Sequence, residues 1–384
     1  MCIPLRTRHS CVAPLILSIV RIMRPVKSIY RGTATMSHFP IVRRSMRLCM
    51  TILMLWWVSP GVSSFAQFVT PGDSVDAPRR PVATYSIVAR DAQTGQMGVA
   101  VQSHWFSVGS IVTWAEAGVG AVATQSFIEP AYGPLGLELM RTGRTAEEAL
   151  RALVVSDAGE AVRQVAMVDA RGNVAAHTGS GAIAAAGHQL GDGFSVQANM
   201  MEHPTVWPAM AEAYRTTEGD LAERMMAALE AAEAAGGDIR GKQSAAILIV
   251  PAEGTGRPWA DKIFDLRVED HPEPLVELRR LITMQRAYNA MNAGDGYMTT
   301  GDIPNAIASY EYAMSLLPDE STNGEAPFWV GITLASVGDV AGALPYLQRA
   351  SRLDVRWKEL VTRLPAAGLL PDDPALIARL VDAM

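Results

Sequence analysis

Short runs of apolar and small residues between positions 84 and 130 constrain the fold of this chain more than any other feature. The runs Tyr85–Arg90 and Met97–Ser103 flank a turn in which Gly95 can adopt a positive φ, so they predict a β-hairpin. The runs 111–114 and 119–126 predict two further strands. Because their apolar residues are nearly continuous rather than alternating, these strands should be buried on both faces.

The order of the later elements indicates how such strands are covered. Helical spacing is present over 136–142 and 145–155, where Thr145 and Glu148 form a capping box, and again over 206–215 and 221–235. Strands are expected over 164–169, 174–177, 194–199, 244–250 and 262–268. Strands, two helices, strands, two helices and strands predict an α+β fold with helices covering packed sheets.

The chain reads as helical from Glu273 onward and contains an internal repeat. Gly301-Asp302 recurs 37 residues later as Gly338-Asp339. At the same offset Ala306 matches Ala343, Tyr310 matches Leu347, Ala313 matches Ala350 and Leu316 matches Leu353. This pattern resembles the tetratricopeptide repeat, whose period is about 34 residues. We therefore expect one domain over 84–282 and a small all-α repeat domain over 283–384, which packs on the first because about three repeats are needed to stand alone.

The formal net charge of −6 combines two unlike pieces. Residues 1–66 contain nine Lys or Arg, no Asp or Glu, and all three cysteines, which leaves 24 basic and 39 acidic residues in the remainder. The body therefore excludes a cysteine nucleophile, a cysteine-ligated metal and any disulfide. An acidic body without a basic block also argues against a nucleic-acid partner.

The N-terminal region has the parts of a secretory leader. Basic residues precede the eleven-residue apolar run Leu48–Val58, and small residues lead to Ala66, after which we expect cleavage and export to the periplasm or the medium. The run is shorter than the roughly 20 residues of a spanning helix, so no permanent membrane span is expected. Residues 1–35 lack leader features, and we expect translation to begin at Met36 or Met46. The proline-containing stretch 67–83 is predicted to be a linker.

Two glycine-rich motifs do not predict nucleotide binding. The segment GGDIRGK over 236–242 is followed by Gln243, where a phosphate loop needs Ser or Thr. The glycines of 118–123 lead into a strand rather than a helix. The histidines of the body lack the helical spacing of a zinc motif, so the sequence requires no metal and no organic cofactor.

Polar residues gather where the predicted strands begin or end. Such positions are typical of a site carried by a rigid sheet. They are Thr84, the consecutive Gln102, Ser103 and His104, Thr178, Asn199, and Lys242.

Several long strings resemble one family at once. TYSIVARDAQTGQMGVAVQSHWFSVGSIVTWAEAGVGAVATQS, YGPLGLELMRTGRTAEEAL, VAAHTGS, VQANMM and GGDIRGKQSAA resemble the domain of unknown function 1028, over about 84–282. That family is grouped with the N-terminal-nucleophile hydrolases. The resemblance implies a four-layer αββα sandwich whose nucleophile opens the first strand and carries a free α-amine.

The resemblance also implies site residues. Thr84 matches the nucleophile, and its α-amine, with a pKa of about 7.7–8.0, would act as the base. This chemistry requires a cut between Ala83 and Thr84. Ser103 and His104 match polar positions beside the nucleophile, Lys242 would lower the pKa of the amine or stabilise the oxyanion, and Asn199 would donate to the oxyanion. The residues expected to bind substrate are Gln102, His177, Thr178, Gln197 and Gln243.

Three functions remain open at this point. The favoured one is hydrolysis of a small amide or related C–N bond with Thr84 as nucleophile. The second is a non-catalytic ligand-binding protein whose helical repeats recruit a partner protein. The third is a hydrolase that uses Ser103 with His104 or His177. A homo-oligomer is expected in each case.

Overall fold

The computed structural model describes residues 81, 82 and 84–384. The predicted leader, the three cysteines and most of the predicted linker lie outside these residues. Two antiparallel sheets form the first part of the described chain. In spatial order, the six-stranded sheet contains β10 (Phe264–Val268), β9 (Ser244–Val250), β2 (Met97–Ser103), β1 (Thr84–Arg90), β8 (Phe194–Asn199) and β7 (Gly187–Gly191). The four-stranded sheet contains β3 (Thr113–Glu116), β4 (Gly120–Ser126), β5 (Arg163–Asp169) and β6 (Val174–Thr178).

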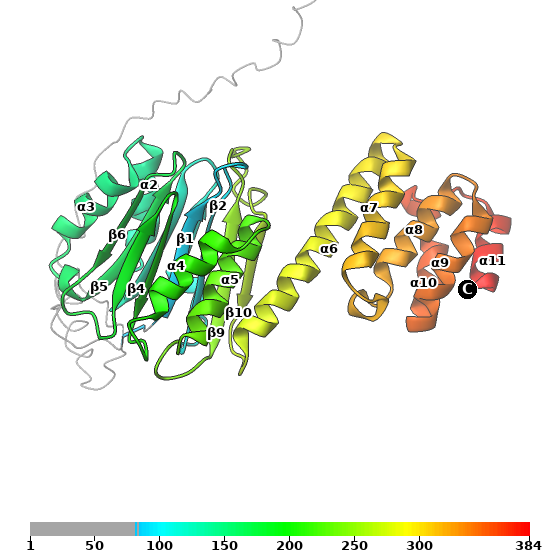
Figure 1. Cartoon of the computed structure of the whole chain (residues 1–384). Coiled ribbons are helices and arrows are strands. Elements are labelled where there is room, and N and C mark those ends of the chain that lie inside the picture. Colours follow the sequence, from blue (N-terminus) through cyan, green and yellow to red (C-terminus); the bar gives the residue numbers. More distant parts are fainter. Residues whose placement is uncertain (1–80, 83) are drawn as a thin grey trace, which may run out of the picture. The chain divides into compact units, whose positions relative to one another are not determined.

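The two sheets lie face to face, and each is covered by a pair of helices (Figure 1). The pair α4 (Val206–Thr216) and α5 (Leu221–Ala234) packs on the six-stranded sheet. The pair α2 (Tyr132–Arg141) and α3 (Ala146–Ser156) packs on the four-stranded sheet. The described chain is therefore a mixed α/β structure with antiparallel sheets, as the element order predicts.

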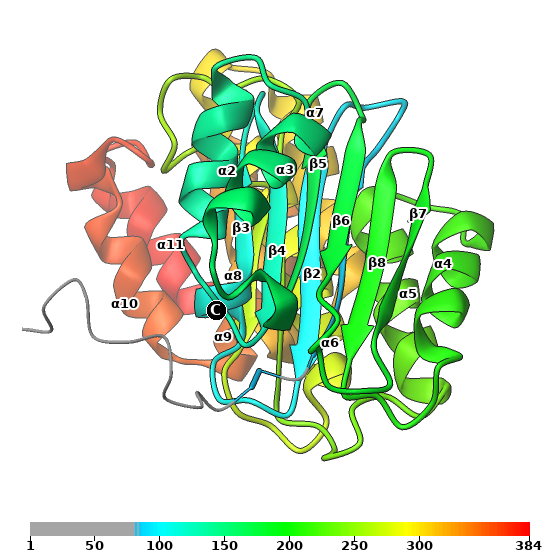
Figure 2. The same cartoon turned by 90° about the vertical axis from the view of Figure 1, so that its left-hand side faces the viewer.

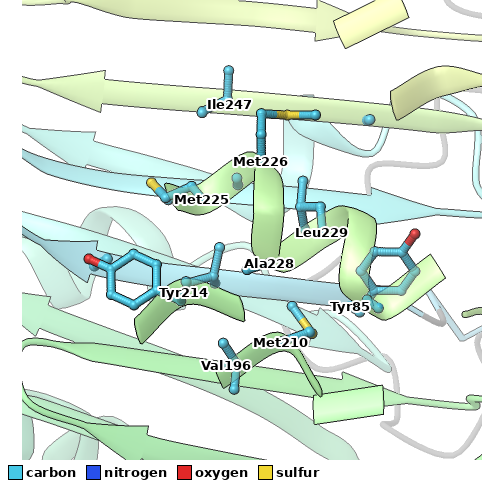
Figure 3. Packing of buried hydrophobic residues seen from close by; sticks show 14 of the residues in the cluster. Tyr85, Val196, Met210, Tyr214, Met225, Met226, Ala228, Leu229 and Ile247 are labelled. Atoms are coloured by element: carbon cyan, nitrogen blue, oxygen red, sulfur yellow. The ribbon is translucent and has the colours of Figure 1, made fainter. Parts of the chain in front are cut away.

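The side chains of β1 alternate between two hydrophobic cores. Tyr85 and Ile87 belong to the core beneath α4 and α5, which Figure 3 shows from close by, whereas Val88 belongs to the core between the two sheets. Successive side chains of a strand point to opposite faces. Both faces of β1 are consequently buried. The same holds for β4, as its nearly continuous run of apolar and small residues predicts.

Three local predictions differ from the structure. The strand expected over 111–114 is instead a short helix, α1 (Gly109–Val112), followed by β3. The helix expected from 136 begins at Tyr132, and its Gly133 packs against the ring of Trp114, where a Cβ would lie only 2.3 Å from a ring atom. The half-buried edge strand β7 has no apolar pattern and is missed by sequence reasoning. The capping box of α3 is confirmed.

The described chain ends in a helical segment. It contains α6 (Pro274–Thr300), α7 (Ile303–Leu316), α8 (Glu325–Ser336), α9 (Val340–Leu353), α10 (Arg356–Arg363) and α11 (Pro374–Ala383). The start of α6 contributes Leu278 and Ile282 to the core beneath α4 and α5, whereas Ala287 and Met291 contribute to a core with α7 and α8. The domain boundary expected between 282 and 283 thus falls inside one unbroken helix.

The two Gly-Asp pairs of the internal repeat lie in the turns that precede α7 and α9. Gly301 ends α6 with a φ of 76°, and the side chains of Asp302 and Asp339 cap α7 and α9. Three of the four repeat-related pairs are buried, whereas Leu316 and Leu353 are half-buried. The buried residues are Ala306, Ala343, Tyr310, Leu347, Ala313 and Ala350. Of the helices described, none is both long and apolar enough to cross a lipid bilayer.

Candidate active site

The space between the two sheets is apolar at one end and polar at the other. The apolar part includes Val88, Val99, Ala123 and Leu248. At the other end, side chains of the same strand faces are polar and fully buried. They are Thr84, Ser86, Ser103, Gln125, Gln164, Ser195, Gln197 and Asn199. We refer to these eight residues as the polar layer.

Thr84 lies in this layer at the start of a central strand. Its Oγ1 is 3.0 Å from the carbonyl oxygen of Val82 and 3.3 Å from Ser103 Oγ. Its own carbonyl oxygen accepts a hydrogen bond of 3.2 Å from Gln125 Nε2. Asn199, on β8, is the register partner of Thr84, and its Nδ2 lies 3.5 Å from the same carbonyl oxygen. The structure therefore brings the predicted residues Thr84, Ser103 and Asn199 together.

Side-chain amides connect the two sheets around Thr84. Gln125 Nε2 donates to Gln164 Oε1 at 2.7 Å, and Asn199 Nδ2 donates to the same oxygen at 3.0 Å. Ser86 Oγ donates to Gln125 Oε1 and accepts from Gln197 Nε2, both at 2.6 Å. A network with this many satisfied groups holds its members in one arrangement.

Sequence reasoning missed Ser86, Gln125 and Gln164. Each is a polar residue on the inner face of a strand that is otherwise apolar, and that pattern is the signal that would have found it. Of the residues that the sequence predicts to bind substrate, Gln197 lies in the polar layer and Thr178 lies at its border. Thr178 Oγ1 accepts from Gln164 Nε2 at 2.9 Å.

Some buried polar atoms near Thr84 have no hydrogen-bond partner within the described part of the chain. They are Asn199 Oδ1 and Ser126 Oγ. Ser126 also has a φ of 71°, which is uncommon for a residue other than glycine. Its backbone pairs with that of Val82 through bonds of 2.7 and 3.1 Å. Buried groups without partners are costly, by about 1–3 kcal/mol each, and a functional role is one explanation for their presence.

Lys242 does not lie beside Thr84, contrary to the expected arrangement. Its ammonium binds Glu273 at 2.6 Å and is 3.9 Å from Glu233. Glu233 in turn accepts from the hydroxyl of Tyr85 at 2.7 Å, on the face of the sheet covered by α5. The hydrogen bond to Glu273 raises the pKa of Lys242. Lys242 is thus a charged partner of two carboxylates on the opposite face from Thr84.

Gln102 also faces that opposite side. It is the register partner of Tyr85, and alternation along β2 directs it away from Ser103 and toward the helices. Its amide is buried and has no partner among the described residues. Burial and the neighbouring Glu233 together raise the pKa of Tyr85.

The remaining predicted residues lie at the periphery. The backbone N–H of His104 donates to Asp238 at 3.1 Å. His177 Nε2 is 2.9 Å from the carbonyl oxygen of Glu160, on the outer face of the four-stranded sheet. That position directs His177 away from Ser103, so the structure does not support a Ser103–His177 pair. Gln243 Nε2 donates to an exposed Asp270.

Over residues 81, 82 and 84–384 there is no cluster of three or more His, Cys, Asp or Glu residues arranged to hold a metal ion. The polar layer supplies hydroxyl and amide groups in a site shielded from water. In such surroundings hydrogen bonds are stronger than in water.

Fold and site together define an α/β protein with two facing antiparallel sheets and a polar candidate site between them. The chain belongs to the family of unknown function DUF1028, whose model matches residues 84–278. The resemblance identified from the sequence strings is thereby confirmed.

One solved structure similar to this chain is the crystal structure of protein SPO2555 from Silicibacter pomeroyi, which is also assigned to DUF1028. The two are 32% identical over 52% of this chain and 87% of that one, with a TM-score of 0.47. Comparison with curated proteins gives no significant match.

Proposed function

We propose that the protein is an exported hydrolase of a small amide or related C–N bond, with Thr84 as an N-terminal nucleophile. The observation that carries this proposal is the position of Thr84. It opens a central strand, its hydroxyl is 3.3 Å from Ser103 Oγ, and its backbone is held by Gln125 within a buried polar layer. The helix–sheet–sheet–helix layering agrees with the αββα sandwich of the N-terminal-nucleophile hydrolases that the sequence resembles.

The proposed reaction needs a free α-amine on Thr84. The amine takes the proton of the Thr84 hydroxyl as Oγ1 attacks the amide carbonyl carbon, and it passes that proton to the departing nitrogen. This leaves an ester on Thr84, which water then hydrolyses to release the acid and regenerate the hydroxyl. The N–H of Asn199 that makes only a 3.5 Å contact with the carbonyl oxygen of Thr84 would donate to the oxyanion.

Cleavage before Thr84 would also change access to the site. In the intact chain the side chain of Thr84 is fully buried, and its hydroxyl lies against the carbonyl oxygen of Val82. Val82 is held by its backbone pairing with Ser126. A cut between residues 83 and 84 would remove the covalent link to this covering segment, so its departure would uncover the hydroxyl and the unpartnered atoms of Ser126 and Asn199.

The test is the N-terminal sequence of the exported protein, which should begin Thr-Tyr-Ser-Ile. Detection of Gln67 as the sole N-terminal residue would contradict the proposal. In addition, Thr84→Ala should abolish turnover of an amide library, whereas Thr84→Ser should retain it because a hydroxyl nucleophile remains. Thr142→Ala is the matched control, because the exposed Thr142 hydroxyl bonds only to the helix backbone.

A second candidate function is ligand binding without catalysis, with the tetratricopeptide-like helices recruiting a partner protein. The repeat-related buried residues of α7 and α9 favour such a segment. Removal of residues 287–384 should then reduce capture of the partner more than it affects the site. An unchanged set of captured proteins would contradict this role.

A further inference from the structure

A hollow lies at the border of the polar layer, on the side of the sandwich formed by the edge strands β6 and β7. Figure 2 shows these two strands on the same side of the molecule. The hollow has a volume of about 480 Å³. Its lining consists of small residues and one histidine: Thr178, Gly179, Ser180, Ala182, Ala184, Ala186, Gly187 and His188. The lining contains no carboxylate, lysine or arginine, so it offers no charge to an ionic ligand.

The orientation of the Gln164 amide beneath the hollow is fixed by its neighbours. Its Oε1 accepts from the amides of Gln125 and Asn199, so the NH₂ group must lie on the other side. That NH₂ group faces Thr178 Oγ1 at 2.9 Å and the carbonyl oxygen of Ala198 at 2.9 Å. Rotation of the amide by 180° would place its NH₂ group against the NH₂ groups of Gln125 and Asn199.

This orientation determines the role of Thr178. Its Oγ1 accepts from Gln164, and the hydroxyl proton then needs an acceptor, which His188 Nδ1 at 2.8 Å can supply in one of its two neutral tautomers. His188 Nδ1 is then an acceptor, and the neutral imidazole carries its proton on Nε2. Burial, together with the nearby His177, lowers the pKa of His188, which favours this neutral form.

We propose that the hollow is a binding subsite for a small uncharged molecule with a carbonyl acceptor, such as an amide, and that the Nε2–H of His188 is its hydrogen-bond donor. Thr178 is a positioning residue that fixes the tautomer of this donor. The hollow lies beside the layer that holds Thr84, since Gln164 contacts both Thr178 and Gln125. β8 separates β7 from β1, so two strand spacings, about 10 Å, separate His188 from the strand of Thr84.

The assignment of this ligand as part of the substrate rests on the proposed hydrolase function, whereas the binding itself does not. Binding is therefore measured in the full-length Thr84→Ala variant, which lacks the proposed nucleophile. The probe is N-acetylglycinamide, and its charged counterpart N-acetylglycine is the control ligand. The imidazole ¹⁵N signals of His188, assigned by their loss in His188→Gln, report both tautomer and binding.

We expect the His188 signals to show the Nε2–H tautomer and to shift saturably with N-acetylglycinamide but not with N-acetylglycine. Thr178→Val should weaken binding about tenfold, the equivalent of one hydrogen bond, and Thr178→Ser should restore it. Thr142→Val controls for loss of an exposed hydroxyl elsewhere. Absence of a His188 shift, or equal binding of the two probes, would overturn the subsite. If His188 responds while the exported protein does not begin at Thr84, the subsite stands and the hydrolase proposal fails.

Discussion

Replacing Gln164 by methionine tests the energetic role of the polar layer. The two side chains are similar in length, but methionine removes a fully buried amide that makes hydrogen bonds through both its oxygen and its nitrogen. Gln125 and Thr178 keep other partners after the change. Asn199 Nδ2 retains only a 3.5 Å contact, and the carbonyl oxygen of Ala198 loses its side-chain donor.

One buried group, the side-chain amide of Asn199, is therefore left without a good partner, because the carbonyl oxygen of Ala198 still belongs to the β7–β8 ladder. At about 1–3 kcal/mol for such a group, the free energy of unfolding should fall by about 1–3 kcal/mol. Unfolding of the full chain in urea is monitored by circular dichroism, and Gln243→Met is the matched control. Gln243 donates only to an exposed carboxylate through its side chain, so its replacement should change stability by less than about 0.5 kcal/mol. A loss below about 1 kcal/mol for Gln164→Met, with an unchanged urea dependence, would refute the reasoning.

Two further predictions concern stability elsewhere in the chain. Burial alone raises the pKa of Asp157, but its hydrogen bonds, with Arg163 foremost among the donors, hold it below its ordinary value. The stabilisation of the fold by these hydrogen bonds is fully present above the unfolded-state pKa of about 4, and it is lost as pH falls through the lower folded-state pKa. Asp157→Asn should therefore cost about 1–3 kcal/mol at neutral pH and progressively less in acid, and an equal cost in both would contradict this cause. Gly331→Ala should lower the melting temperature of the helical segment, because the new Cβ would lie 2.6 Å from Leu347 Cγ. Gly296→Ala, with open space around it, should be neutral or stabilising, and equal effects of the two changes would show that packing is not the cause.

Sequence patterns predicted the elements that are set by local chemistry. The capping box of α3 and the burial of β4 on both faces follow from neighbouring residues. The strand β7 could not be predicted in this way, because its half-buried residues lack a periodic apolar pattern. It forms because β8 offers it a pairing edge, which is a property of the folded sheet.

In the candidate site, too, some residues could be placed from the sequence and others could not. Thr84, Ser103 and Asn199 were predicted from strand ends and from the resemblance, and the structure brings them together. Lys242 was placed with them on the same reasoning, although its loop directs it to Glu273 on the opposite face. Register decides which face a strand residue occupies, and a loop residue has no such register to follow.

The continuity of α6 has a consequence for how this chain could be divided or recombined. The helix of 27 residues extends about 40 Å as a single rod, and the family match ends at residue 278, within its first turns. A fragment cut at that point would lose Ile282 from the sandwich core, whereas Ala287 and Met291 would stay with the helices against which they pack. A genetic exchange that preserves both cores must therefore join the pieces between Ile282 and Ala287, with the helix kept continuous, beyond the segment that the family model matches.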